Sequence, residues 1–586
     1  MFLAIGAGLA ALVLALAFTV PTLGSRWFEA LEQSFGKLAQ RQGLSVVVVG
    51  LTALALRLAL LPILPIPVPG IPDEFGYLLQ SDTFAHGRLA NPSNPMWVHF
   101  ETLLVLWQPT HVAKYWPAQG LFLAVGQALL GHPFWGVWLS VGIMCAAITW
   151  MLQGWLEPGW ALLGGFLTVI RFGTFNYWAN SYWGGAVAAI GGALVLGALP
   201  RMKQRFCARY GLLMGVGFAI LGNSRPYEGL FFGIPVAASM LVWLWKMKRP
   251  EFGRAMKRLL APLLVVLALT LVAMGYYFWR TTGDPFNPPY LVYEHAYNPV
   301  PYFPWQSPRP IPVYRHPHLR RYFLESQMPV YRSSRTVSGL AQLDLVKLIL
   351  IWSYFLGPVF TLPFLLLPSA LPVGFSWGDI SPGTRLLLEV AGMVLLANLL
   401  LNWYFPHYSA PATAAVVALV LVAMRTIRPW KWREKPVGRF VTRAVPSLCV
   451  ILFAIAIVVG SLLPTFKFEM LRASVLPSWC WQSPPNPGRE AALQKVKQYP
   501  GRQLVIVHYS PNHIGDNNES VYNRANIESA KVVWAQDMGP KKNEELIRHF
   551  KNRRVWLYYA DEHPLKLVPY TAAADRQTCT QFPKGP

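Results

Sequence analysis

Long apolar runs constrain this chain more than any other feature. Many of them reach about 17 residues or more, and short turns rich in Pro and Gly separate them. Runs of this length cross the hydrocarbon core of a bilayer as α-helices. Only 13% of the 586 residues are charged, about half the usual share for a soluble domain. The sequence therefore predicts a polytopic α-helical membrane protein.

The apolar runs predict about twelve spanning helices in a transmembrane domain over residues 1–464. A small external α/β domain is expected over residues 465–586. The predicted helices cover 2–20, 44–66, 133–155, 158–175, 185–200, 210–224, 229–245, 259–279, 345–367, 384–402, 408–424 and 444–464.

Basic blocks between the apolar runs predict the orientation. The blocks at 201–209, 246–258 and 425–443 are dense in Lys and Arg, which favours the cytoplasmic side. The same clustering explains the net charge of +24 without a nucleic-acid partner. Counting helices from these blocks predicts an external N-terminus and four external stretches in a bacterial inner membrane. These stretches are 67–132, 176–184, 280–344 and the residues after about 465.

The first external stretch places two acids, Asp73 and Glu74, just after the second apolar run. The segment "DEFGYLLQSDTFAHG" predicts a helix that lies on the membrane. Asp73 follows Pro72 and is explained either as the N-cap of this helix or as part of a site. The site hypothesis also accounts for the other polar residues in this stretch, which are Asp82, His86, His99, Glu101 and His111.

An acid at the membrane surface suits a base for an incoming hydroxyl or a ligand for a divalent metal. A phosphate leaving group would also need cations. Candidates occur in three further turns, which contain Lys114; Arg225 and Glu228; and His407 and Tyr408. Each has an alternative role: Lys114 can reach lipid head groups, Arg225 and Glu228 can bridge on a helix turn, and His407 can pack or cap.

The ordered set of turns resembles the GT-C glycosyltransferases, in particular bacterial protein-mannosyl and aminoarabinose transferases. The features are an external acid after an early helix, "KYWP" before a half-length helix, "SRPYE" between two helices, and "FPHY" late in the chain. The resemblance covers about residues 44–464. It implies a GT-C fold, a polyprenyl-phosphate-sugar donor and transfer to an acceptor hydroxyl outside.

The resemblance also implies roles for single residues. Asp73 corresponds by position to the family's base or metal ligand, with Glu74 beside it and Mg or Mn as the metal. Phosphate binding is expected from Lys114, Arg225, His407 and Tyr408, and contacts to the substrates from Glu228, His86 and Glu101. A direct displacement at the anomeric carbon would invert the configuration. The resemblance does not indicate whether the acceptor is a glycan, a lipid or a protein.

The turn at 176–184 departs from the family pattern. Many relatives carry a second acid there, whereas "NYWANSYWGG" contains none. Asn180 suits a hydrogen bond to a sugar hydroxyl, and Tyr182 or Trp183 suits stacking on a sugar face. The alternative is an aromatic belt at the membrane interface. The small residues that follow predict close helix packing.

The third external stretch, residues 280–344, is rich in Pro, Tyr and Arg. It carries seven Arg and no Lys. A loop of this length in a compact protein is usually functional or disordered, and its aromatic residues argue against disorder. We expect a lid or an acceptor-binding element, with anion contacts from His295, Arg315, His316 and Arg320.

The C-terminal segment predicts a small α/β domain. Strands are expected at 502–509, 530–537 and 554–562, with a helix at 543–553. The segment "HYSPNHIGDNNE" is either a ligand loop or a plain turn, and its Gly, Asn and Asp favour the turn. Cys480 and Cys579 would both meet an oxidising compartment, and we expect them to form a disulfide.

Two other classes of function compete with glycosyl transfer. A transporter or flippase of a lipid or sugar would show repeats and ionisable groups at the bilayer midplane. The sequence has no clear repeat, and its charges lie at helix ends. A non-enzymatic envelope assembly protein would not need the ordered turns. The sequence therefore favours the glycosyltransferase.

Overall fold

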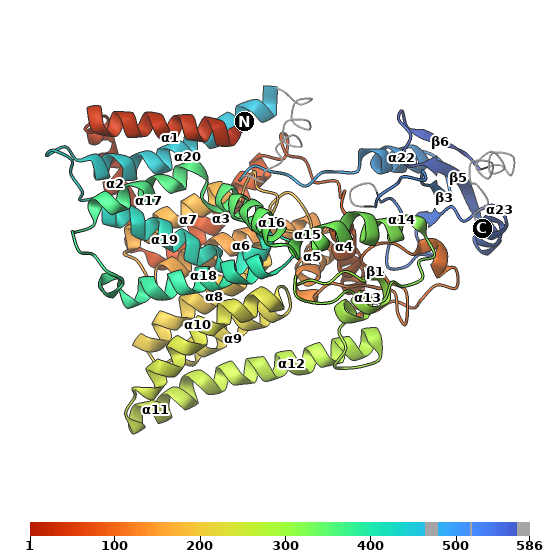
Figure 1. Cartoon of the computed structure of the whole chain (residues 1–586), viewed down its shortest axis with the longest axis horizontal. Coiled ribbons are helices and arrows are strands. Elements are labelled where there is room, and N and C mark those ends of the chain that lie inside the picture. The colour runs from red at the N-terminus through yellow and green to blue at the C-terminus, as the bar shows by residue number, and fades with distance from the viewer. Residues whose placement is uncertain (463–478, 516–518, 571–586) are drawn as a thin grey trace. The chain divides into compact units, whose positions relative to one another are not determined.

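The computed structural model describes residues 1–462, 479–515 and 519–570. The chain forms two compact units, each built from three separate stretches. The helical unit comprises residues 1–66, 134–272 and 337–482. The α/β unit comprises residues 67–133, 273–336 and 483–586. The elements of both units are labelled in Figure 1.

The helical unit consists of helices only among its described residues. In chain order they are α1 (Phe2–Thr19), α2 (Ser25–Gln40), α3 (Gln42–Ala59), α6 (Phe134–Leu152), α7 (Pro158–Phe172), α8 (Ala186–Gln204), α9 (Ala208–Gly222), α10 (Pro226–Trp245), α11 (Arg249–Ala255), η2 (Met256–Leu260), α12 (Ala261–Thr282, which continues into the α/β unit), α16 (Val337–Ile351), η4 (Trp352–Leu356), α17 (Gly357–Ala370), η5 (Trp377–Asp379), α18 (Pro382–Leu400), η6 (Pro406–Ala412), α19 (Thr413–Ile427) and α20 (Val437–Leu462).

The prediction of a polytopic helical protein is confirmed. Ten helices in the described part of the chain are long and apolar enough to cross a membrane. Each of the twelve predicted spans is a helix, but α7 and α9 have only 15 residues each. The span predicted at 259–279 belongs to a continuous helix of 34 residues, Arg249–Thr282, which is prominent in Figure 1.

Helix α2 was not predicted, because it is amphipathic rather than apolar throughout. The Glu32 carboxylate on this helix accepts hydrogen bonds from Arg428 Nη2 at 2.9 Å and Arg443 Nε at 3.0 Å. The two arginines belong to the basic block between α19 and α20. These ion pairs attach α2 to the same end of the helical unit as that block.

Small residues allow α8 to pack closely against its neighbours, as the sequence predicts. A Cβ at Gly192 would lie 1.9 Å from the carbonyl oxygen of Pro411 in η6. A Cβ at Gly191 would lie 2.9 Å from the carbonyl oxygen of Gly217 in α9. Glycine is therefore required at both positions, because the obstacle is backbone that cannot rotate away.

The α/β unit combines short helices with two sheets. Its elements are α4 (Pro72–Ala85), η1 (Trp97–Phe100), β1 (Val105–Leu106), β2 (Val112–Ala113), α5 (Pro117–Leu130), α13 (Pro289–Tyr297), α14 (Pro317–Arg321), η3 (Tyr322–Gln327), α15 (Met328–Ser334), α22 (Pro487–Lys497), β3 (Arg502–His508), β4 (Val532–Gln536), α23 (Pro540–His549), β5 (Arg553–Tyr559) and β6 (Lys566–Pro569).

The larger sheet has the strand order β4-β3-β5-β6. Strands β4, β3 and β5 are parallel, with Val505 opposite both Trp534 and Trp556, and β6 runs antiparallel to β5. The three predicted strands and the predicted helix are confirmed, although α23 begins and ends earlier than expected. Strand β6 is short and was not predicted.

Alternating side chains give the larger sheet two apolar faces. Val505 and Val507 pack with Ala492 and Val496 of α22 on one face. The opposite face, which includes Leu504, packs with α23 through Leu546 and Phe550. This period of two is that of a strand buried on both sides.

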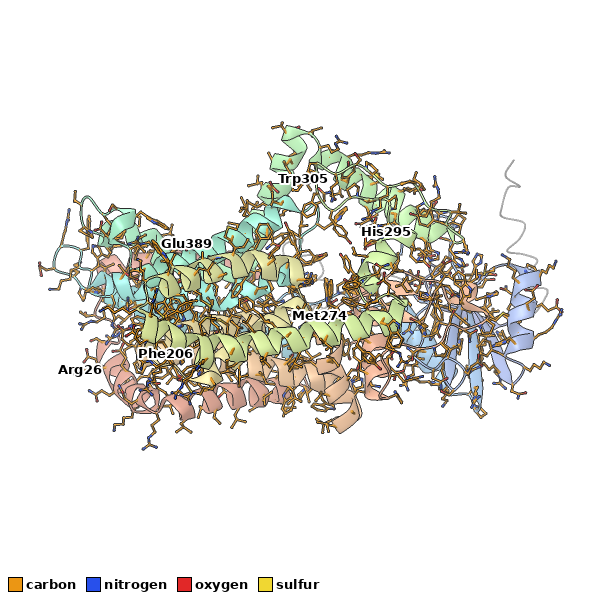
Figure 2. All side chains as sticks on the ribbon, turned by 90° about the horizontal axis from the view of Figure 1, so that it is seen from below. Arg26, Phe206, Met274, His295, Trp305 and Glu389 are labelled. Atoms are coloured by element: carbon orange, nitrogen blue, oxygen red, sulfur yellow. The ribbon has the colours of Figure 1, made fainter. Side chains whose placement is uncertain are left out.

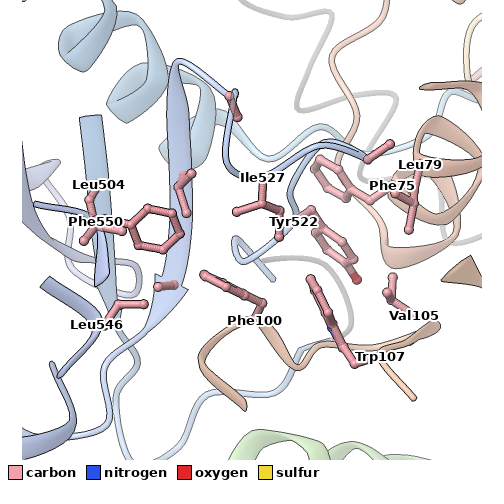
Figure 3. Close-up of a cluster of buried hydrophobic side chains, with 14 of the residues drawn as sticks. Phe75, Leu79, Phe100, Val105, Trp107, Leu504, Tyr522, Ile527, Leu546 and Phe550 are labelled. Atoms are coloured by element: carbon pink, nitrogen blue, oxygen red, sulfur yellow. The ribbon is translucent and has the colours of Figure 1, made fainter. Parts of the chain in front are cut away.

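The second face of the sheet shares its core with the first loop region (Figure 3). The Phe100 ring contacts that of Phe550 edge to face, with centroids 6.2 Å apart. Phe75 of α4 stacks on Tyr522 with centroids 4.2 Å apart. The residues after 483 therefore form one body with both long loops, rather than a domain of their own over 465–586.

Helix α4 is largely buried in the protein, and its position on a membrane stays a prediction. Ten of its fourteen residues are buried. It packs against α5 and β2, and Asp82 Oδ2 accepts a 2.9 Å hydrogen bond from the backbone N–H of Ala525. Its charged residues near the start had suggested an exposed helix, but the C-terminal segment covers it.

The Pro-rich stretch 280–344 is largely ordered into helices α13, α14 and α15. His295 on α13 and Trp305 in the following loop are exposed, and both are labelled in Figure 2. Their exposure leaves them available to a ligand, and the role of this stretch as a lid stays a prediction.

We predict that Phe100→Ala lowers the free energy of unfolding of the α/β unit by about 3–5 kcal/mol, because it leaves a cavity in the shared core. Urea titration with brief proteolysis of the purified full-length protein measures this change. Phe286→Ala is the matched control, since Phe286 is 89% exposed. Equal effects of the two substitutions would contradict the shared core.

Candidate functional site

The Asp73 carboxylate is held by a tyrosine. Asp73 is the second residue of α4 and is half-buried. Its Oδ1 accepts a 2.6 Å hydrogen bond from the Tyr115 hydroxyl, and the Tyr115 ring stacks on Tyr77 with centroids 4.4 Å apart. Burial, together with the nearby Asp73 charge, raises the pKa of Tyr115, so this hydroxyl stays protonated and donates. Asp73 is thereby an oriented carboxylate that remains partly accessible.

A glycine makes this arrangement possible. A Cβ at Gly76 would lie 2.8 Å from the ring of Tyr115. Any other residue at this position would push the ring away from α4 and lengthen its hydrogen bond to Asp73. The segment "DEFG" thus places the acid and the space for its partner within one helical turn.

The N-cap role belongs to Glu74 rather than to Asp73. The Glu74 carboxylate is buried and accepts a 2.9 Å hydrogen bond from the backbone N–H of Gly70. It also accepts longer bonds from the N–H of Ile71, at 3.5 Å, and the hydroxyl of Ser483, at 3.4 Å. These contacts anchor the chain that enters α4. Because Glu74 caps the helix, capping does not account for Asp73.

Lys114 forms a buried ion pair. Its Nζ lies 2.9 Å from Glu294 Oε1 on α13, and both side chains are buried. The rings of Tyr290 and Tyr293 each lie 4.9 Å from the ammonium group. Asn298 donates to the other Glu294 oxygen. Glu294 therefore neutralises the Lys114 ammonium group, which we expected from the sequence to bind a phosphate.

Glu101 belongs to a different cluster from Asp73. Its Oε1 accepts hydrogen bonds from the Tyr297 hydroxyl, at 2.7 Å, and from Arg315 Nη1, at 3.2 Å. His316 Nε2 lies 3.7 Å from Oε2. Burial raises the pKa of Glu101 although Tyr297 and Arg315 oppose the shift. These contacts join the first loop to the Pro-rich stretch.

His86 is exposed at the end of α4. Its Nδ1 donates to the carbonyl oxygen of Asp82 at 2.7 Å. The Asp82 carboxylate accepts from Gln127 Nε2 at 2.9 Å, besides its bond to Ala525. The structure thus gives Asp82 a packing role. A substrate contact by His86 stays a prediction.

In the helical unit, Arg225, His407 and Tyr408 converge. The Arg225 guanidinium lies over the Tyr408 ring, 4.3 Å from its centroid. The backbone N–H of His407 donates to the Tyr177 hydroxyl at 3.0 Å, and that hydroxyl lies 2.9 Å from His407 Nδ1. These two contacts with one hydroxyl hold the His407 ring in place beside Tyr177.

The other predicted residues of the helical unit are buried. Glu228 lies in the first turn of α10. Asn180 Nδ2 donates to the carbonyl oxygens of Thr174 and Asn176, both at 2.7 Å, and so fixes the turn. Tyr182 is 2% exposed and Trp183 is 3% exposed. The structure assigns these side chains to packing, since a sugar would have to displace protein to reach them.

The acids of α4 do not fit a divalent metal ion. The Glu74 carboxylate is engaged by backbone N–H groups, and Asp73 accepts from a tyrosine. In the ranges that the model covers, no three His, Cys, Asp or Glu side chains are arranged to hold a metal. We therefore derive no step through a metal.

Sequence reasoning missed the partners of these residues. Tyr115 directly follows Lys114, but only the fold brings it to Asp73. Glu294 had a usable signal, because it is the only acid between residues 285 and 324. Tyr177 offered no signal besides its place in a turn rich in aromatic residues.

The predicted disulfide involves a residue outside the described ones. Cys480 is buried, whereas Cys579 lies beyond residue 570. The pairing stays a prediction.

Comparisons with known proteins give structural likenesses only. No family model matches the chain, and no curated protein matches it. Among solved structures, ArnT from Cupriavidus metallidurans bound to undecaprenyl phosphate is similar at 14% identity and a TM-score of 0.44. The match covers 88% of this chain and 92% of that one.

The oligosaccharyltransferase of Archaeoglobus fulgidus in the apo form is similar at 12% identity and a TM-score of 0.42, over 88% of this chain and 69% of that one. The archaeal oligosaccharyltransferase AglB from the same organism, in complex with an inhibitory peptide and a dolichol-phosphate, has a TM-score of 0.39. Both proteins belong to the GT-C superfamily that the turn motifs resemble. Likenesses this weak carry no information on the chemistry of the site.

We predict that Lys114→Met lowers the free energy of unfolding of the α/β unit by about 3–5 kcal/mol, because it leaves the Glu294 charge buried and unpaired. The double variant Lys114→Met/Glu294→Leu should recover most of this loss. Urea titration of the full-length protein measures both. Full stability of the single variant would contradict a structural ion pair and return Lys114 to ligand binding.

Proposed function

We propose that this protein is a membrane glycosyltransferase of the GT-C type. It moves a sugar from a polyprenyl-phosphate donor to an acceptor hydroxyl. The reaction occurs on the external, periplasmic face of a bacterial inner membrane. The ten candidate spans and the basic blocks of the helical unit support this location, and the ordered turn motifs support the class of reaction.

The observation that carries the proposal is the Asp73 carboxylate. It is half-buried at the start of α4, and the Tyr115 hydroxyl orients it through Oδ1 at 2.6 Å. A general base must be held in place and must remain reachable by the group from which it takes the proton. Asp82, Glu74 and Glu101 are buried, whereas Asp73 is partly exposed. Asp73 is therefore the acid of the first loop region best suited to this role.

The leaving phosphate needs positive charge and hydrogen-bond donors. Within the helical unit, Arg225, which lies over the Tyr408 ring, is a cation suited to bind a phosphate. Tyr177 orients the His407 ring through its contact with Nδ1. Arginine matches phosphate oxygens with a planar set of N–H groups. Lys114 is left out of this role because Glu294 neutralises it.

The proposed step is a single displacement. Asp73 takes the proton of the acceptor hydroxyl while the oxygen of that hydroxyl attacks the anomeric carbon. The bond from that carbon to the phosphate oxygen breaks, and its electron pair leaves with the polyprenyl phosphate. Cations and hydrogen-bond donors stabilise such a departing charge. The configuration at the anomeric carbon inverts.

We predict that Asp73→Asn lowers sugar transfer by about 100- to 10,000-fold, the usual contribution of a general base. Purified full-length protein in lipid nanodiscs is given radiolabelled polyprenyl-phosphate sugars and a cell-envelope extract as acceptor. Asp284→Asn is the matched control, because Asp284 is exposed in the turn after α12. It should transfer sugar at the wild-type rate.

Two results would contradict the proposal. Equal transfer by wild type and Asp73→Asn would remove Asp73 from the mechanism. No transfer by the wild type with any donor, combined with sugar or lipid movement across the nanodisc-derived vesicles, would favour the transporter or flippase. No transfer and no movement would favour the assembly protein.

A further inference from the structure

A cavity of about 330 Å³ opens at the carboxyl ends of β3 and β4 in the α/β unit. Six polar residues in its wall are His316, His318, Arg321, His508, Gln536 and Asp537. From β3 the chain passes to β4, and from β4 it crosses through α23 to β5 on the other side of β3. The strands that follow β3 therefore lie on opposite sides of it. Open α/β sheets bind ligands in the crevice at a point where the strand order reverses in this way.

His508 presents an oriented imidazole to this cavity. Its Nδ1 donates to Asp537 Oδ2 at 2.7 Å. Asp537 Oδ1 in turn accepts from the N–H of Gly539, at 3.1 Å, and from Asn543 Nδ2, at 2.8 Å. Burial opposes the charge of Asp537, but the bonds from His508 and Asn543 hold its pKa below the ordinary value. Within the described part of the chain, His508 Nε2 has no hydrogen-bond partner.

Arg321 adds a cation that no acid neutralises. Its Nη1 donates to the carbonyl oxygen of His513 at 3.3 Å. No carboxylate in the described ranges lies within 4.0 Å of its guanidinium. By contrast, Lys114 and Arg315 in the same unit pair with Glu294 and Glu101. A half-buried arginine without an acid, in the wall of a cavity, suits an anionic ligand.

The acids near the cavity are engaged by groups other than Arg321. His318 Nε2 lies 3.1 Å from Glu519 Oε2, and the Tyr509 hydroxyl donates to Oε1. Burial opposes ionisation of Glu519, but His318 lowers its pKa to about 2. His318 and Tyr509 thus both contact this carboxylate. Burial lowers the pKa of His316 to about 4, so this imidazole is neutral at pH 7.

We propose that this cavity binds a sugar-sized molecule with one anionic group. The anion lies against Arg321 and His508, and Gln536 and Asp537 meet its hydroxyl groups. The volume is at the lower end of the range for small-ligand pockets, which fits about one monosaccharide and excludes a polyprenyl chain. The anionic group is a phosphate or a carboxylate, because the guanidinium fork matches both. Binding here does not depend on the proposed transfer reaction.

This site gives residues 508–511, the start of the loop "HYSPNHIGDNNE", a ligand-binding role, which is the alternative that the turn residues disfavoured. His508 through Pro511 form part of the wall of the cavity. The Pro-rich stretch contributes from the other side through His316 and Arg321. Two segments that the sequence treated separately thus build one site.

Isothermal titration calorimetry on full-length protein in nanodiscs tests the proposal. The probes are glucose 1-phosphate, glucuronate and neutral glucose. We expect saturable binding of at least one anionic probe, weakened at least tenfold by Arg321→Gln and by His508→Asn. The stronger of the two anionic probes identifies the group as phosphate or carboxylate. Failure of sugar transfer would leave this result unaffected.

Matched variants separate a ligand contact from a loss of folding. Arg320→Gln changes the neighbouring arginine, which lies within 3.6 Å of Glu325 and outside the cavity wall. His549→Asn removes another imidazole paired with an acid, at 2.9 Å from Glu528. Both should bind like wild type.

Thermal melting checks that each variant is folded. If His508→Asn is unstable, the binding measured with Arg321→Gln decides the test. The proposal is overturned if no anionic probe binds, if glucose binds as tightly as both anionic probes, or if Arg320→Gln weakens binding as much as Arg321→Gln.

Discussion

The packing of the C-terminal sheet against the first loop region is the interaction on which the α/β unit depends. Phe100 contacts Phe550, and Phe75 stacks on Tyr522. The strands need this contact because one face of the sheet would otherwise expose Leu504 and its apolar neighbours. The loop needs it because α4 is too short to be stable alone. Each part supplies the surface that the other must bury.

This shared core also determines the environment of Asp73. The chain after Ser483 passes so close to Gly70 that a Cβ there would lie 1.9 Å from the carbonyl oxygen of Pro484. Arg489 lies over the ring of Phe75, 4.7 Å from its centroid. The entry to α4 and its first turn are thereby fixed. The orientation of Asp73 by Tyr115 thus rests on residues more than 400 positions away in sequence.

The sequence was most informative where the signal is local. Where the chain is described, all twelve predicted spans are helical, because the length of an apolar run directly indicates a spanning helix. The three parallel strands were likewise predicted from their own short runs of residues. Helix α2 was missed because its apolar face covers only part of its circumference, and β6 because four residues carry little pattern.

Roles that depend on a distant partner could not be predicted in this way. The sequence treated Lys114 as a free cation, but Glu294, 180 residues later, neutralises it. It left Asp73 as either the cap or part of a site, and only the fold shows that the longer side chain of Glu74 reaches back to the N–H groups of Gly70 and Ile71. Arg225, His407 and Tyr408 were proposed from two separate turns, and the approach of the Arg225 guanidinium to the Tyr408 ring needed the fold.

Amide hydrogen exchange on the full-length protein in nanodiscs tests the shared core most directly. If the loops and the sheet form one body, the amides of α4 and of β3 should open together with the same free energy. Free exchange along α4 while β3 stays protected would contradict this account. It would show that the C-terminal segment folds alone and does not position Asp73.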